Sequence, residues 1–217
     1  MSNILLYIST GFILFAYLGY FLFILFGRNK KVSNSSGFDV TKDIISEYNS
    51  INVIESKSYF TMYNIKRRVI KLSMGNYYGK DLSSISLSLL EAVISVIDDK
   101  KNIYIDYIRK IFSNLKILYI FPLIAILINN LSFNVSDAKA SIFFLVIFTF
   151  ISYILVNIKI QASCWIRENL KKISGISKDN RLKIDNFIDR LVFFDKIIFF
   201  GEVIIIIRLM LIFFDII

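Results

Sequence analysis

Long uncharged stretches alternate with polar stretches along the chain. Residues 1–27 contain no charged side chain, and two further charge-free runs lie between Lys116 and Asp137 and over Ala140–Ile158. Because about 20 apolar residues in a helix cross the ~30 Å hydrocarbon core of a bilayer, each run predicts a transmembrane helix. We expect the second and third to form a helical hairpin over residues 117–158, with a polar turn at Asn134–Lys139.

The last apolar stretch, residues 191–217, is interrupted by charged residues, and we still interpret it as a fourth transmembrane helix. Ionisable groups inside a span cost roughly 2.5–3.5 kcal/mol each and usually mark a transport pathway or a partner. Positions three and four residues away from Glu202 are all apolar, so its partner must come from another helix. The predicted intramembrane polar cluster comprises Glu202, Arg208, Asn129 and Asn130, with Lys159 as a further candidate partner. It forms an ion or proton path or a polar clamp between helices, or else the last helix lies partly at the membrane interface.

The polar stretches predict the topology. Residues 28–116 hold 15 Lys+Arg and 9 Asp+Glu, and residues 159–190 hold 8 and 4. Positive charge collects on the cytoplasmic side of membrane proteins, which places both regions in the cytoplasm and the N-terminus outside. The basic excess favours contact with anionic lipid headgroups.

The pattern within the larger polar region indicates a small α+β part. Thr41–Asn49 is amphipathic, and Ser58–Tyr63 and Arg68–Leu72 alternate apolar and polar residues as in a β-hairpin. Leu82–Ile97 is an apolar stretch, too short for a span, that predicts a buried or interfacial helix with a solvated end at residues 98–101. The predicted fold is an α-helical integral membrane protein with about four transmembrane helices and a small cytoplasmic α+β part.

Composition excludes several classes of enzyme. Hydrophobic residues make up 56% of the 217 residues, the net charge is +9, and the chain contains one cysteine and no histidine. Catalytic triads that use histidine and His-ligated zinc sites are therefore excluded, as is an internal disulfide. No cofactor is indicated. We do not expect a nucleic-acid partner, because no basic helix stands apart from the predicted membrane segments.

The order of these elements, with four short stretches, resembles the bacterial membrane-bound neutral zinc metallopeptidase family of the YugP type. The similar stretches are Gly37-Phe38 before a helix, Ile70-Lys71-Leu72-Ser73, Tyr77-Tyr78-Gly79-Lys80, and Ile158–Ser163 after the third predicted span. The resemblance covers nearly the whole chain and implies a location in the bacterial cytoplasmic membrane, with several spans.

The chain departs from this family at the metal site. In the family, two histidines at positions i and i+4 bind zinc, and a glutamate between them is the general base. The resemblance places Leu90 and Ile94 at the histidine positions, retains Glu91, and places Lys159 at the third ligand. Glu91 either pairs with Lys159 or faces solvent or the interface. The resemblance therefore implies a scaffold that holds no zinc.

We interpret the chain as a non-catalytic membrane protein, a pseudo-peptidase, that acts as a binding, adaptor or regulatory subunit. Its expected partners are the bilayer and either other membrane proteins or further copies of itself. Two alternatives remain open. One is a small channel or transporter-like component that uses the polar cluster around Glu202, and the other is an active zinc metallopeptidase.

Overall fold

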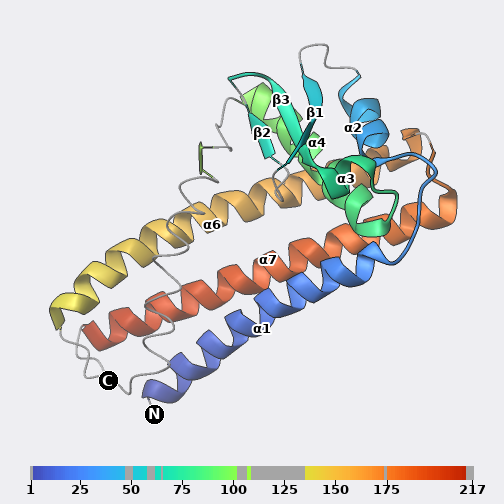
Figure 1. The fold of residues 1–217 in the computed structure, drawn as a ribbon. Helices are drawn as coiled ribbons and strands as arrows, with labels where there is room; N and C mark the ends of the chain where they lie inside the picture. The colour runs from blue at the N-terminus through green and yellow to red at the C-terminus, as the bar shows by residue number, and fades with distance from the viewer. Residues whose placement is uncertain are drawn as a thin grey trace. The chain divides into compact units, whose positions relative to one another are not determined.

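The computed structural model of the chain describes residues 2–46, 51–57, 62–64, 66–101, 107–108, 135–173 and 175–213. Three long helices dominate it: α1 (Ser2–Arg28), α6 (Val135–Asn169) and α7 (Lys178–Phe213) (Figure 1). Within the described residues, two helical segments, Thr10–Arg28 and Val146–Lys172, are long and apolar enough to cross a membrane.

The helix boundaries differ from the predicted membrane boundaries. Residues 135–139, which we expected to lie in a turn, form the start of α6, and α6 continues eleven residues beyond Ile158. Likewise, α7 begins at Lys178 rather than near residue 191. Polar residues such as Lys and Gln have good helix propensity, so a helix does not end where its apolar stretch ends. The second predicted span, between Lys116 and Asp137, lies almost entirely outside the described residues.

Gly175 separates α7 from a short 3-10 helix, Leu170–Lys172, that follows α6. Its φ of 74° lies in the left-handed region, which glycine adopts without steric cost. A Cβ at this position would lie 2.0 Å from Ser35 Oγ. The Gly175 carbonyl accepts a hydrogen bond from Ser33 Oγ at 3.2 Å. This glycine thus connects the turn before α7 to the segment that follows α1.

The residues form two compact units. The first contains residues 1–19, 108–156 and 194–217, and the second contains residues 20–107 and 157–193. In the first unit the buried apolar side chains include Ile13, Phe148 and Ile205. Gly201 of α7 admits Ile13, whose Cγ1 would lie 2.4 Å from an added Cβ. The absence of a side chain at Gly201 therefore allows α1 and α7 to approach closely.

A three-stranded sheet lies in the second unit, with the order β1-β3-β2. Strand β2 (Met62–Asn64) pairs antiparallel with β3 (Val69–Ser73), which confirms the predicted hairpin, although residues 58–61 lie outside the described residues. Strand β1 (Asn52–Ser56) pairs in parallel with β3 on its other side and was not predicted. Its side chains are mostly exposed, so it lacks the apolar alternation that marks a half-buried strand.

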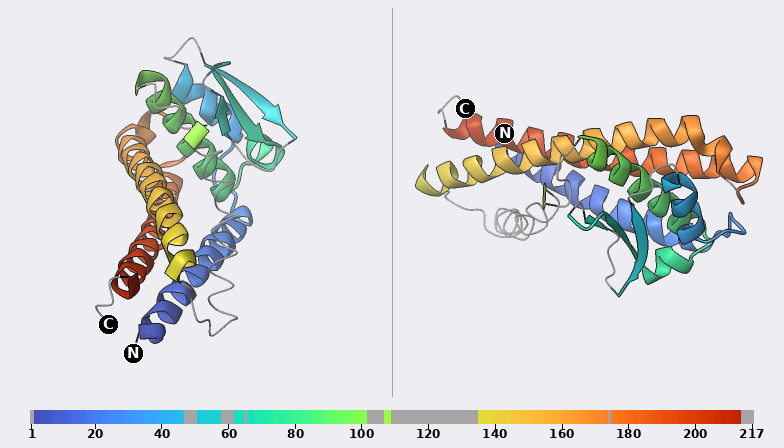
Figure 2. Two further views of the ribbon diagram at one scale, coloured as in Figure 1. Left: turned by 90° about the vertical axis from the view of Figure 1, so that its left-hand side faces the viewer. Right: turned by 90° about the horizontal axis from the view of Figure 1, so that it is seen from above.

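Helices α2 (Gly37–Ile45), α3 (Met74–Tyr78) and α4 (Leu82–Lys101) also belong to the second unit and contact the sheet (Figures 1 and 2). The amphipathic helix predicted from Thr41 begins four residues earlier, because Ser36 and Asp39 form a capping box at its start. The Ser36 backbone N–H and hydroxyl both donate to Asp39, and these hydrogen bonds lower the pKa of its carboxyl group.

Candidate functional site

The two histidine positions and the glutamate that the resemblance assigns to the metal site lie on α4, which is buried along most of its length. The side chains of Leu90 and Ile94 are 6% and 2% exposed, so both belong to the apolar interior of the second unit. They are four residues apart and therefore share one face of the helix. Glu91 is 6% exposed, so the interpretation that it faces solvent is wrong.

Lys159 lies on α6 in the same unit. Its ammonium nitrogen lies 5.8 Å from the centre of the Tyr20 ring, a distance typical of a cation–π contact. The pairing of Lys159 with Glu91 stays a prediction. Within the part of the chain that the structure describes, no three Cys, Asp or Glu residues form a group that could hold a metal ion.

The end of α4 is less exposed than predicted. Asp98 is fully buried, and Asp99 accepts a hydrogen bond from the Tyr63 hydroxyl at 3.2 Å and lies 3.4 Å from Arg68 Nε. Burial, followed by the charge of Asp99, raises the pKa of Tyr63. The prediction of a solvated helix end is therefore wrong for Asp98, whereas the Asp99 side chain is 20% exposed and Lys100 and Lys101 are exposed.

The predicted polar cluster can be followed only in part. Glu202 of α7 is fully buried in the first unit, and its carboxylate lies within electrostatic range of the Tyr17 hydroxyl on α1. Asn129 and Asn130 lie outside the described residues, and so does the side chain of Arg208, although its backbone belongs to α7. The structure thus adds Tyr17 as a neighbour of Glu202 that sequence reasoning did not select.

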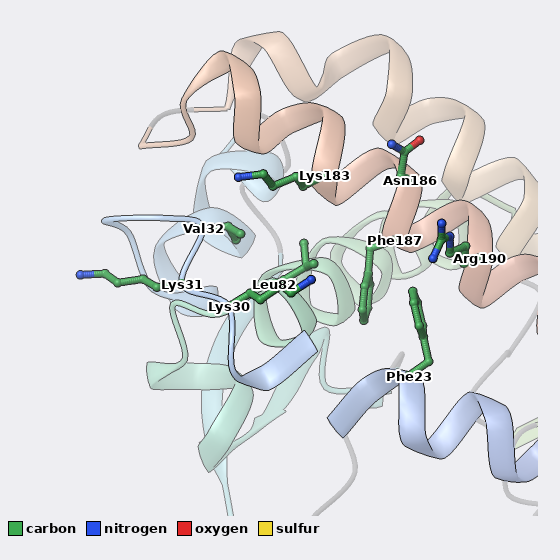
Figure 3. A pocket seen from close by; sticks show the side chains of 9 residues that line it. All are labelled: Phe23, Lys30, Lys31, Val32, Leu82, Lys183, Asn186, Phe187 and Arg190. Carbon is green, nitrogen blue, oxygen red and sulfur yellow. The ribbon is translucent and has the colours of Figure 1, made fainter. Parts of the chain in front are cut away.

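A pocket of about 580 Å³ in the second unit was not predicted. We call it the basic pocket, because four of its nine lining residues are cationic and none is acidic. Figure 3 shows the Lys30 side chain reaching toward the ring of Phe187, while Lys31 extends away from it. The lining residues are Phe23, Lys30, Lys31, Val32, Leu82, Lys183, Asn186, Phe187 and Arg190.

Two stacked aromatic rings form one side of the basic pocket. The ring centres of Phe23 on α1 and Phe187 on α7 are 4.4 Å apart, with an angle of 19° between the ring planes. The guanidinium carbon of Arg190 lies 5.8 Å from the centre of the Phe23 ring. The pocket therefore combines an apolar wall with cations, a composition suited to an amphipathic anion.

Sequence reasoning missed this pocket because its residues come from segments that are far apart in the chain. Its only local signal is the basic end of the first apolar stretch, which contains Lys30 and Lys31. Lys183 and Arg190 lie more than 150 residues later, and α7 places them beside that end.

We compared the chain with protein-family models, curated proteins and solved structures, and none of them matched. The metallopeptidase resemblance therefore rests on the residues of this chain alone, and functional assignment rests on the geometry of α4, of the region around Glu202 and of the basic pocket.

Proposed function

We propose that this chain is a non-catalytic membrane protein that uses a metallopeptidase-like scaffold for binding, as an adaptor or a regulatory subunit. The observation that carries the proposal is the burial of Leu90 and Ile94 in the apolar interior around α4. A catalytic zinc site needs three protein ligands and an open position for water. Side chains that fill the interior supply neither donor atoms nor access for a substrate.

The exposed surface of the long helices supports a membrane location. On α1, large apolar side chains are exposed at successive turns, and in water such a continuous apolar surface would be unfavourable. These residues are Phe12, Leu14, Phe15, Leu18, Phe21, Leu22, Leu25 and Phe26. We propose that α1, α6 and α7, together with the segment between Lys116 and Asp137, supply four spans in a bacterial cytoplasmic membrane, with the N-terminus outside.

Two assays on purified, reconstituted protein test the absence of catalysis. We expect no cleavage of a casein substrate with added zinc, and no stoichiometric zinc after dialysis. The matched variant is Glu91→Gln, which removes the retained general base of the family motif. Casein cleavage that a chelator and Glu91→Gln both abolish would overturn the proposal in favour of an active peptidase.

A binding role predicts a stable complex in the membrane. We expect crosslinking in native membranes, followed by purification in mild detergent, to capture either a second membrane protein or a further copy of this chain at a fixed ratio. A chain that stays monomeric and without a partner at native expression level would contradict an adaptor or regulatory role.

A second candidate function, a small channel or transporter component, is favoured by the full burial of Glu202 in an otherwise apolar part of α7. Buried ionisable residues within membrane spans often line ion or proton paths. Flux of protons or monovalent cations into liposomes tests it. Flux that Glu202→Gln abolishes, and that the exposed control Glu168→Gln leaves intact, would support this second function.

A further inference from the structure

We propose that the basic pocket binds the phosphate of an anionic phospholipid headgroup, with phosphatidylglycerol as the simplest probe. This inference rests on the proposed membrane location of α1 and goes further by assigning a specific lipid site. Basic pockets between helices on the cytoplasmic side of a membrane are known to hold such headgroups.

The positive charges of the basic pocket complement the single negative charge of a phosphodiester headgroup. Lys30 and Lys31 come from the segment after α1, and Lys183 and Arg190 come from α7, so cations border the pocket from two segments. The Asn186 amide adds a neutral hydrogen-bonding group. Because the lining contains no carboxylate, an anion entering the pocket meets no opposing negative charge at its walls.

The position of the pocket favours a lipid over a free phosphate ion. The apolar segment Thr10–Arg28 ends two residues before Lys30, so the cations lie where headgroups would meet the end of that segment. Leu22 and Phe26 are exposed on the last turns of α1 and lie within about 100° of Phe23 around the helix. A lipid with its phosphate at Lys30 could lay its acyl chains along these residues, which a soluble phosphate would leave uncovered.

Hydrogen bonds from the backbone and from the Asn180 side chain hold the pocket in shape, and Lys183 donates to Asn180 Oδ1 at 3.1 Å. The Leu82 N–H donates to the Lys30 carbonyl at 2.8 Å, and the Val32 N–H donates to the Lys80 carbonyl at 3.0 Å. The Asn180 side-chain amide donates to the Val32 carbonyl at 2.8 Å. A site formed in advance loses little conformational entropy on binding, and a volume near 580 Å³ is typical of small-molecule pockets.

Native mass spectrometry of the delipidated full chain in neutral detergent tests the site. A neutral detergent micelle has no surface charge of its own, so any preference for an anionic lipid comes from the protein. We expect one phosphatidylglycerol to bind saturably and phosphatidylcholine to bind at least tenfold more weakly. The double variant Lys30→Glu and Arg190→Glu should weaken phosphatidylglycerol binding at least tenfold, since each cation contributes about a fivefold factor. The control Lys171→Glu and Lys172→Glu, which makes the same change in net charge at exposed positions away from the pocket, should stay within twofold.

Four other outcomes would contradict the proposal, each for a different reason. If the double variant unfolds, Lys183→Gln and Lys30→Gln provide milder changes, and a loss of less than twofold in both would overturn the proposal. Binding of inorganic phosphate at the same concentration as phosphatidylglycerol would show a soluble-anion site instead. Equal losses in the pocket variant and the control would show nonspecific charge attraction. Extraction of the wild-type chain from membranes by alkaline carbonate would refute the membrane location itself, whatever the detergent assay shows.

Discussion

Gly37 offers a sharp test of the packing in the second unit. It is the first residue of α2, and its N–H donates to the Gly79 carbonyl at 3.0 Å. A Cβ at Gly37 would lie 2.0 Å from the Asn76 backbone oxygen and 2.5 Å from Ser88 Oγ, where ordinary contacts begin at 3.4 Å. In Gly37→Ala, α2 must therefore move more than 1 Å from the Asn76 carbonyl, which breaks its hydrogen bond to Gly79.

The lost hydrogen bond costs about 1 kcal/mol, and the strain of overpacking costs about 1–3 kcal/mol. We therefore expect Gly37→Ala to lower the free energy of unfolding by about 2–4 kcal/mol, or the unfolding midpoint by about 5–15 °C for a chain of this size. Thermal unfolding in detergent, followed by circular dichroism, measures the shift. The control is Gly75→Ala in α3, where only the tip of Arg28 lies within 4 Å. Equal midpoints for the two variants would refute the close contact of α2 with α3.

Three further predictions follow from the contacts of single side chains. Ile94→Ala should lower the free energy of unfolding by about 2–4 kcal/mol, as expected for a buried residue. A chelator should leave the unfolding midpoint unchanged in the wild type and in this variant. A drop on adding chelator would indicate a structural metal. Because the pKa of Tyr63 is raised, the folded state favours its neutral form, and the free energy of unfolding should fall as the pH rises above about 10. Tyr63→Phe should make this fall less steep. If the pH profiles of the two proteins are the same, the raised pKa is refuted. Arg167 pairs with Asp185 and Asp189, and because it is half-exposed, Arg167→Ala should cost only about 1 kcal/mol, less in 1 M salt; a loss that salt does not change would argue against an ionic contribution.

Sequence patterns predicted the elements whose signals are local. The amphipathic pattern, the hairpin and the buried helix at Leu82 all correspond to observed elements, because side-chain periodicity acts over a few residues. The start of α2 was misplaced by four residues, since the Ser36–Asp39 capping box was not recognised in the sequence. Strand β1 was missed because its pairing with β3, rather than its own pattern, makes it a strand.

The candidate sites were harder to predict than the secondary structure, because they depend on contacts between distant parts of the chain. The apolar pattern of Leu82–Ile97 predicted a buried or interfacial helix, but the burial of its charged residues Glu91 and Asp98 depends on what packs against α4. The basic pocket requires Phe23 and Phe187 to stack, a contact between residues 164 positions apart. Charge counting predicted a basic surface near the membrane but could not gather the cations into one cavity.

The second unit has a consequence for the synthesis of the protein, because it is assembled from two separate pieces of the chain, residues 20–107 and 157–193. Ser33 forms a β-bridge with Ile176, so the first piece lacks native neighbours until the second emerges from the ribosome. At 5–20 residues per second, the 86 residues from 107 to 193 take about 4–17 s to translate. During that interval Ser33 lacks its bridge partner and Phe23 lacks the ring of Phe187, and this period is when a chaperone or protease has its best access to the chain.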